Sequence, residues 1–394
     1  MSDQETSFSW LIDESKTWPP FGRPKAPFGP TDLEVLRSCS LRRCFEVSGS
    51  YERRIGFAAR IGTAFHRTLE SLFQTPPQAS EIAEVAEEAK RRFAQELQKQ
   101  EDEKAKRPRE QWLPMDEARI QRALETLIVE AQRIVREAGK DDYDERPVSQ
   151  EFLRLEGQES PDHLIEGQIE TEVLVKSEDG LLHGRVDYAE HLSEGVRLLD
   201  YKSALRTDLP ERYGRQLQLY ALLWHETRGE WPSKALVVYP FTGLTYSISV
   251  DPMTCTSVGD ESRRLIAHIQ SVRQAERLAT PGDVCKVCEF RPWCKPFWQW
   301  QAQENSHTVA LERAYLGFEG TIERIEVVNE HWRISIHWRD CTVRIAAPVD
   351  RFTQLHQAYV GMRVRALEAR LRGLRYQPQA LVTEMSELFL LLEN

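Results

Sequence analysis

An acid and a lysine two residues apart, in the β-like run Val196–Lys202, constrain this chain more than any other feature. Alternate side chains of a strand point to the same face, so Asp200 and Lys202 should project together. Upstream, the run Gly184–Tyr188 carries a second acid, Asp187, and a Ser-Glu-Gly turn signal separates the two runs. This order predicts an antiparallel hairpin that brings Asp187 close to Asp200. A surface hairpin can carry the same tripeptide by chance, so the pattern alone leaves both interpretations open.

Two carboxylates and a lysine at one point suit the hydrolysis of a phosphodiester. Carboxylate oxygens bind Mg²⁺ or Mn²⁺, and a lysine beside the metal can orient water or offset charge on a phosphate. Two helical segments extend the set. His66 lies beside an apolar stripe of helical spacing, and Gln216 and Tyr220 share one face of a second amphipathic helix. Each signal is weak alone, but together they form an ordered pattern.

That order resembles the RecB-type branch of the PD-(D/E)XK nucleases. In that branch a G-x-x-F-H helix, a G-x-x-D strand, a D-Y-K strand and a Q-L-x-x-Y helix follow one another, as they do here between about Thr31 and Phe297. The resemblance implies three metal ligands, one catalytic lysine and two residues that complete the site: His66, Asp187 and Asp200, then Lys202, then Gln216 and Tyr220. Glu172 is a possible extra carboxylate, for which a solvated strand edge is the competing interpretation.

Three of the seven cysteines, Cys285, Cys288 and Cys294, have the spacing C-x2-C-x5-C, which is typical of metal binding. The segment Met1–Trp18 is polar and acidic and has no signal-peptide pattern, so we expect a cytoplasmic protein without structural disulfides. Three thiolates need a fourth ligand. A subgroup of the same branch, similar to AddB and the CRISPR adaptation nucleases, holds a [4Fe-4S] cluster with one N-terminal and three C-terminal cysteines. By that resemblance Cys39 is the fourth ligand.

Two alternatives remain open at the cysteine group. Cys44 competes with Cys39 as the fourth ligand, and a serine follows Cys39 where the subgroup usually has proline. Four thiolates also hold Zn²⁺ by the general rules, so only the resemblance favours iron and sulfur. A cluster would tie the segment near Cys39 to the segment near Cys294 and close a loop around the catalytic core.

The remaining sequence predicts three regions. Residues 1–30 form an extended lead-in, since Trp18–Pro30 holds five prolines and two glycines. Residues 31–300 form an α/β nuclease domain of the PD-(D/E)XK, restriction-endonuclease-like class. A charged helical insertion spans about 79–140 and has a break at Lys106–Pro114. The expected strands of this core cover residues 165–176, 181–190, 196–202, 235–240 and 245–250.

Residues 308–394 form the third region, a small all-β domain with expected strands at 316–328, 332–345, 360–365 and 388–392. Apolar Trp332, Ile334, Ile336 and Trp338 alternate with polar and basic residues, which predicts a sheet with one face buried. We expect an OB-like barrel, with SH3-like topology open. OB barrels commonly bind single strands through basic and aromatic groups. The candidate contacts are Arg363, Arg365, Arg370, Arg372 and Arg375. A packing or protein-docking module is the other interpretation.

Charge and motifs exclude several classes. A net charge of -10 disfavours general affinity for DNA, although a local basic groove is compatible with it. The sequence has no apolar run of about eighteen residues, so we expect no membrane contact. It also has no nucleotide-motor motif, so a helicase partner would have to unwind any duplex.

We therefore expect a metal-dependent deoxyribonuclease of the exonuclease type that uses Mg²⁺ or Mn²⁺ on single-stranded or unwound DNA in repair, recombination or defence. Two alternatives share the fold: a DNA-binding adaptor without turnover and an RNA-processing nuclease. Filled catalytic positions argue against the adaptor.

Overall fold

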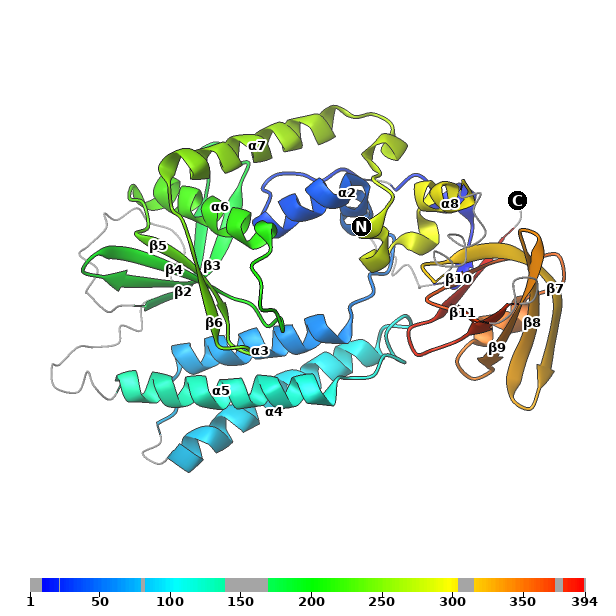
Figure 1. Cartoon of the computed structure of the whole chain (residues 1–394), viewed down its shortest axis with the longest axis horizontal. Coiled ribbons are helices and arrows are strands. Elements are labelled where there is room, and N and C mark those ends of the chain that lie inside the picture. Colours follow the sequence, from blue (N-terminus) through cyan, green and yellow to red (C-terminus); the bar gives the residue numbers. More distant parts are fainter. Residues whose placement is uncertain are drawn as a thin grey trace, which may run out of the picture.

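The computed structural model describes residues 9–20, 22–78, 82–138, 169–303, 315–372 and 378–392. These form a helix-covered sheet, followed along the chain by a second, all-β part (Figure 1). Within the described residues, no helix is both long enough and apolar enough to cross a membrane. The predicted α/β core is confirmed.

The core is a five-stranded sheet of order β2-β3-β4-β5-β6. Its strands are β2 (Ile169–Lys176), β3 (His183–Leu192), β4 (Gly195–Tyr201), β5 (Lys234–Tyr239) and β6 (Leu244–Ile248). All neighbours are antiparallel except β4 and β5, which are parallel and are connected through helix α6 (Glu211–Arg228). The five expected strands are therefore confirmed with small shifts at their ends, and residues 165–168 of the first lie outside the described residues.

Helices cover both faces of this sheet (Figure 1). The helices of the chain are α1 (Glu14–Thr17), α2 (Pro30–Ser48), α3 (Phe57–Gln74), α4 (Ile82–Ala105), α5 (Glu117–Ala138), α6, α7 (Pro252–Ser271) and α8 (Lys295–Ala302), with 3-10 turns η2 (Ala275–Leu278), η3 (Asp283–Val287), η4 (Arg291–Trp293) and η5 (Thr353–Gln357). Along β4, Val196 and Leu198 join the core cluster of α6, while Leu199 and Tyr201 join that of α3, α4 and α5. Strand β4 is thus buried on both sides.

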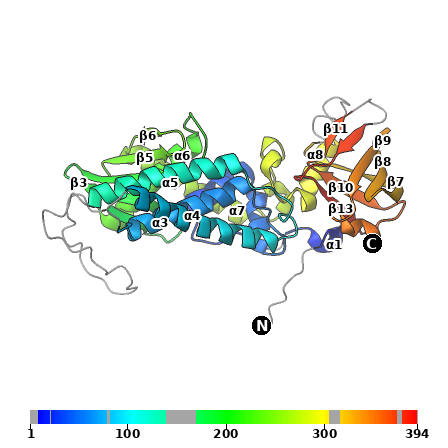
Figure 2. The same cartoon turned by 90° about the horizontal axis from the view of Figure 1, so that it is seen from below.

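Helix α3 is held to the sheet by its apolar stripe. Ile61, Phe65 and Leu69 recur at the i, i+4 spacing and are fully buried, because they fill the interface with α4, α5 and the sheet. Figure 2, seen from below, shows α3, α4 and α5 packed together as one layer. The sequence predicted this helix from the same spacing.

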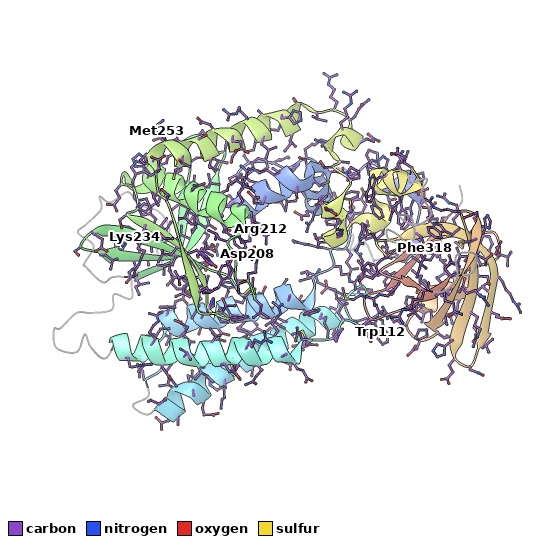
Figure 3. All side chains as sticks on the ribbon, in the orientation of Figure 1. Trp112, Asp208, Arg212, Lys234, Met253 and Phe318 are labelled. Atoms are coloured by element: carbon purple, nitrogen blue, oxygen red, sulfur yellow. The ribbon has the colours of Figure 1, made fainter. Side chains whose placement is uncertain are left out.

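The helical insertion has the predicted break, because α4 ends at Ala105 and α5 begins at Glu117. The connection is not a loose loop. Glu110 is fully buried, accepts hydrogen bonds from the Arg60 guanidinium and accepts another from the backbone N–H of Ile55 at 2.8 Å. Trp112, on the same connection, lies between α5 and the C-terminal sheet in Figure 3. Residues 79–81 and 139–140 of the insertion lie outside the described residues.

The C-terminal part is a curled eight-stranded sheet of order β1-β13-β10-β7-β8-β9-β12-β11. Its strands are β1 (Leu11–Ile12), β7 (Phe318–Val328), β8 (His331–Trp338), β9 (Cys341–Pro348), β10 (Arg363–Leu367), β11 (Arg370–Arg372), β12 (Gln379–Leu381) and β13 (Glu387–Leu391). The apolar face predicted for Trp332 to Trp338 is confirmed, since all four of its residues are buried. The expected run 332–345 is two strands, which turn at Arg339 and Asp340. Closure into an OB-like barrel stays a prediction.

The N-terminal segment is more than a lead-in. Leu11 and Ile12 of β1 pair in parallel with Leu390 and Leu391, so the start of the chain forms an edge of the C-terminal sheet. Helix α1 follows, and its Glu14 reaches the arginines of β10. No local sequence pattern signals this pairing, because its partners are separated by almost the whole chain.

Two of the proposed nucleic-acid contacts already pair with carboxylates of the protein, and their role on nucleic acid stays a prediction. Arg365 is only 2% exposed, pairs with Glu319 and Glu14, and donates to the Pro292 carbonyl at 2.7 Å. Arg363 pairs with the same two carboxylates. Both arginines are therefore compensated by carboxylates of the protein. Arg370 and Arg372 lie exposed on β11 and stay predictions, and Arg375 lies outside the described residues.

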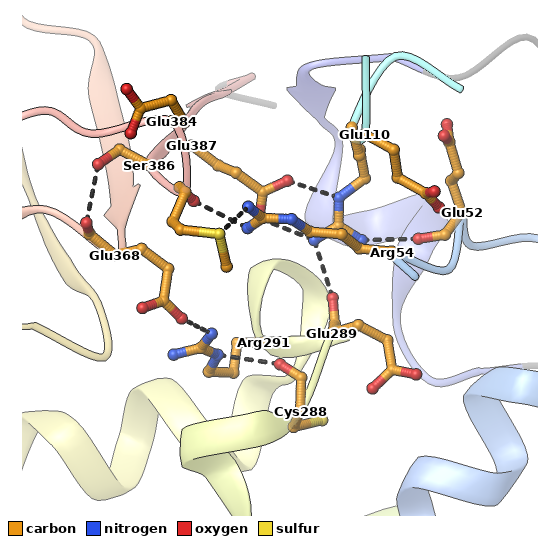
Figure 4. A network of polar contacts seen from close by, with 12 residues as sticks. Glu52, Arg54, Glu110, Cys288, Glu289, Arg291, Glu368, Glu384, Ser386 and Glu387 are labelled. Carbon is orange, nitrogen blue, oxygen red and sulfur yellow. Dashed lines mark hydrogen bonds and ion pairs between the residues drawn. The ribbon is translucent and has the colours of Figure 1, made fainter. Parts of the chain in front are cut away.

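A buried charged network joins the two parts of the chain. Arg109, from the α4–α5 connection, donates to both carboxylate oxygens of Glu387 on β13 at 2.7 and 2.9 Å, and to the backbone carbonyls of Glu52 and Glu289. Arg54 also lies 3.3 Å from Glu387. Figure 4 shows Glu387 and Arg54 meeting in this network, beside the segment that contains Glu289.

We predict that Glu387→Gln destabilises the protein strongly. Glu387 is 3% exposed, and removing one partner of a buried ion pair costs about 3–5 kcal/mol, because the remaining charge stays buried. Chemical unfolding, with the exposed Glu384→Gln as control, measures the difference.

The same residue predicts a pH dependence. Burial alone would raise the pKa of Glu387, but Arg109 and Arg54 hold it below its ordinary value of 4.5. Its stabilising contribution is therefore complete above about pH 4.5 and is lost as the pH falls through the lower folded-state pKa. The stability difference between wild type and Glu387→Gln should shrink over that acidic range. A difference that stays constant there would contradict this.

Candidate active site

The hairpin of β3 and β4 places the two acids side by side. Tyr188 pairs with Leu199, and the next residues of the two strands, in the same direction, are Asp187 and Asp200. Beyond Tyr188 and Leu199 the backbone pairing of the two strands ends. The Asp187 side chain replaces it, since its Oδ2 accepts a hydrogen bond from the backbone N–H of Tyr201 at 2.9 Å. Strand β4 continues beside β5, where the Lys202 N–H donates to the Val238 carbonyl. The hairpin that the sequence predicted is therefore confirmed.

Asp200 and Lys202 project to the same side, as their spacing predicted. Nζ of Lys202 lies 2.7 Å from Oδ2 of Asp200 and donates to Oε1 of Gln216 at 3.1 Å. The Gln216 amide donates to Asp200 Oδ1 at 2.9 Å and contacts the Tyr220 hydroxyl at 3.1 Å. Helix α6 thus holds the orientation of the acid and the lysine through one amide.

A cavity of about 550 Å³ surrounds these groups. All six proposed catalytic and metal-binding residues line it: His66, Asp187, Asp200, Lys202, Gln216 and Tyr220. Other parts of its wall come from Thr31 on α2, Ala58 and Ala59 on α3, and Arg119 on α5. The structure therefore brings together residues from four helices and three strands, while leaving their roles as predictions.

The charges of the cavity are strongly coupled. Burial and the neighbouring Asp200 carboxylate both raise the pKa of Asp187 well above its ordinary range. Burial lowers the pKa of His66, so its imidazole favours the neutral form that binds metals. Burial alone would lower the pKa of Lys202, but the adjacent Asp200 raises it, so the ammonium stays charged. A buried carboxylate, Asp200, and a half-buried one, Asp187, therefore share one cation.

This donor set fits a divalent metal. Carboxylate oxygens and a neutral imidazole are ligands for Mg²⁺ or Mn²⁺, and a cation here would relieve the repulsion that raises the Asp187 pKa. In the described part of the chain, no three His, Cys, Asp or Glu side chains already stand as a metal cage. Binding would therefore have to draw Asp187, Asp200 and His66 closer together.

The glycines of two motifs have a steric cause. A Cβ on Gly184 would lie 2.7 Å from the ring of Tyr220, which packs against β3 at this glycine. A Cβ on Gly62 would lie 2.7 Å from the Ser203 hydroxyl, and Ser203 directly follows Lys202. Both distances are too short for a real contact. Glycine at these positions lets α6 and α3 approach the strands that carry the acids.

The four proposed cluster ligands line a second cavity. Cys39, Cys285, Cys288 and Cys294 surround about 20 Å³, together with Phe45 and Phe297. A space of that size holds about one water, so a cluster would have to part its walls. Cys44 is not on this lining, and its Sγ lies 4.0 Å from Nη1 of Arg23. Cys255 and Cys341 lie elsewhere, on α7 and β9.

The backbone turns Cys39 out of its helix. Within α2, Cys39 alone has extended dihedral angles, φ -163° and ψ 100°, so the helix is kinked there. A proline after a residue favours this same conformation, although Ser40 follows here. Burial raises the pKa of Cys288 to about 12 and raises the pKa of Cys294 well above its ordinary value, so both sulfurs are thiols until a metal replaces the proton.

Comparison with known proteins identifies the fold family. The model of the PD-(D/E)XK nuclease superfamily matches residues 27–295, more than half of the chain, and the chain therefore belongs to that superfamily. Its members are typically metal-dependent nucleases. A search of curated proteins found no match.

One solved structure that matches is entitled "Crystal structure of SSO0001". It shares 18% identity over 44% of this chain and 76% of that chain. Its TM-score is 0.22, which is too low to carry an argument about fold or site.

Three residues of the site escaped the sequence analysis or were given less weight. Tyr213 lies under the Lys202 ammonium, with Nζ 4.9 Å from its ring centre, and its spacing from Gln216 and Tyr220 along one helix face could have revealed it. Glu172 lines the cavity and has a positive φ of 56°, a strained conformation for glutamate. Arg119 lies too far along the chain from the motifs to be connected with them.

We predict that Gly184→Ala disrupts the site without unfolding the core. The added methyl group forces the Tyr220 ring away from β3, which costs about 1–3 kcal/mol as overpacking and releases Gln216 from its contacts. Thermal melting should show a lower midpoint, and any nucleolytic activity should fall at least tenfold. Gly214→Ala is the control. Gly214 lies on α6, as Tyr220 does, and nothing lies within 4 Å of its added Cβ. Equal behaviour of the two variants would contradict the steric account.

Proposed function

We propose that this chain is a metal-dependent deoxyribonuclease of the RecB-type branch that hydrolyses phosphodiester bonds in single-stranded or unwound DNA. The observation that carries the proposal is the gathering of Asp187, Asp200 and Lys202 at one end of a hairpin, in a cavity of about 550 Å³. A buried acid and a half-buried acid beside one lysine are costly to the fold, so their presence is best explained by chemistry.

The residues of the candidate active site would have different roles in the reaction. His66, Asp187 and Asp200 would hold Mg²⁺ or Mn²⁺, which when bound lowers the pKa of water and polarises the scissile phosphate. Lys202, fixed by Gln216, orients the attacking water and offsets the charge that builds on the phosphate. Tyr220 supports the Gln216 amide, so its role is to position rather than to react.

The walls of the cavity favour a single strand as substrate. They include α2, α3 and α5 as well as the strands that carry the acids, so helices flank the approach to the acids. The volume is that of a pocket for a small ligand, such as one nucleotide unit. A duplex would have to be unwound first, which agrees with a helicase partner.

The cysteine group would hold a [4Fe-4S] cluster with a structural role. Support comes from the cavity that Cys39 shares with the three C-terminal cysteines and from the resemblance of the motifs. The ligands lie before and after the catalytic core in sequence, so a cluster would constrain the unfolded chain and stabilise the fold.

We predict that Asp200→Asn abolishes cleavage while preserving the fold and DNA binding. Losing one metal carboxylate removes several kcal/mol of transition-state stabilisation, about a thousandfold in rate. The assay compares single-stranded DNA, duplex DNA and RNA with Mn²⁺, and Asp208→Asn, an exposed acid paired with Arg206, is the control. Undiminished turnover by Asp200→Asn would refute the site. Cleavage of RNA but not of DNA would assign the other substrate.

The cluster predicts that protein purified without oxygen is brown and carries about four iron atoms per chain. Cys288→Ser should lose the colour and the iron and melt at a lower temperature, since the buried ends of the core lose their cross-link. The control is Cys255→Ser, because Cys255 is a buried cysteine on α7 away from the second cavity. This variant should keep the colour and the iron. Stoichiometric zinc without iron in such protein would show that the site is a zinc site.

A further inference from the structure

Arg119 brings a charge from the helical insertion to the catalytic cavity. It lies in the first turn of α5 and lines the cavity with Asp187, Asp200 and Lys202. Among the described residues on this lining, Arg119 and Lys202 are the two permanent cations. Lys202 is compensated by Asp200 at 2.7 Å, so Arg119 is the cation to consider for an incoming anion.

The contacts of Arg119 within the protein are weak. Its Nη1 donates to the Ser203 carbonyl at 3.5 Å, the long limit for a hydrogen bond, and its Nε is buried without a hydrogen-bond partner. Its carboxylate neighbour, Asp116, is 3.9 Å away and already accepts the backbone N–H of Arg119 at the start of α5. The guanidinium is therefore only partly compensated.

Two other arginines of the core have the close polar partners that are typical of a structural role. Arg60 is buried and donates through several nitrogens to Glu110 and Gln100. Arg215, at the start of α6, pairs with Glu34 at 2.7 Å and Glu211 at 2.6 Å. A buried, unsatisfied donor costs free energy, so the poor pairing of Arg119 indicates a partner that arrives from outside.

We propose that Arg119 binds a phosphate of the nucleic-acid strand that occupies the catalytic cavity. This proposal rests on the proposed function and adds a substrate contact to it. A guanidinium matches two phosphate oxygens with parallel N–H donors, a geometry that a lysine cannot supply. The helical insertion is then part of the substrate site, and its connection, anchored through Glu110, sets where α5 begins.

The test measures binding of a fluorescent single-stranded DNA to full-length Asp200→Asn protein, which does not cleave it, with Mg²⁺ present. Adding Arg119→Met, which keeps the apolar stem, should weaken binding about tenfold, since one charge-assisted contact is lost. The slope of log affinity against log salt should fall by about 0.7. Arg119→Lys should recover part of the affinity. Arg122→Met, an exposed arginine of the same helix, should change neither value.

A scan with single neutral methylphosphonates separates contact from structure. In protein with Arg119, one position of the DNA should be sensitive, with about tenfold weaker binding, and in Arg119→Met that position should lose its sensitivity. The proposal would be overturned if the effect of Arg119→Met and the effect of the methylphosphonate were additive at every position of the DNA. Unchanged binding by a folded Arg119→Met variant would overturn it as well. If the wild-type protein neither binds nor cleaves nucleic acid, the proposed function fails as well. If the wild-type protein does both, and Arg119→Met leaves binding by the Asp200→Asn protein unchanged, only the role of Arg119 is wrong.

Discussion

The end of the β3–β4 ladder is the constraint on which the site depends. Beyond Tyr188 and Leu199, Asp187 uses its side chain, rather than its backbone, to bind the Tyr201 N–H. Strand β4 meanwhile stays paired with β5. The two acids therefore lie next to each other at a point where the sheet opens toward the cavity. Every other group of the site, including Lys202 and the Gln216 amide, is positioned relative to this opening.

A second constraint acts at a distance from the chemistry. Arg109 and Arg54 meet Glu387, while Arg291, three residues after Cys288, pairs with Glu368 and donates to the Cys288 carbonyl. The cysteine segment, the helical insertion and the C-terminal sheet thus share one buried network. Because β1 also belongs to that sheet, removing residues after about 316 would expose both β1 and these charges. Such a truncation cannot report on nucleic-acid binding alone.

The sequence was sufficient where the relevant contacts are local. Asp200 and Lys202 are two residues apart on a strand, and Gln216 and Tyr220 are four apart on a helix, so the regular geometry of each element places them. The charged residues of the network could not be assigned this way. Arg109 and Glu387 are 278 positions apart in the sequence, and Arg365 pairs with Glu14, which is 351 positions away. An arginine on a strand has the same local pattern whether it faces DNA or a buried glutamate. Burial decides between them, and burial depends on the tertiary fold.

The position of the cysteine segment changes how a cysteine variant should be interpreted. Glu289, directly after Cys288, accepts ion pairs from Arg42 and Arg53, and its backbone carbonyl binds Arg109. Arg42 and Cys39 both lie on α2, so the turn that carries the proposed ligand Cys39 also supplies a salt bridge to Glu289, next to Cys288. Loss of a metal centre here would loosen contacts to α2, to the α4–α5 connection and, through Arg291, to the C-terminal sheet. A fall in activity after such a loss would then arise from displaced helices around the cavity, without any electron transfer to the reaction.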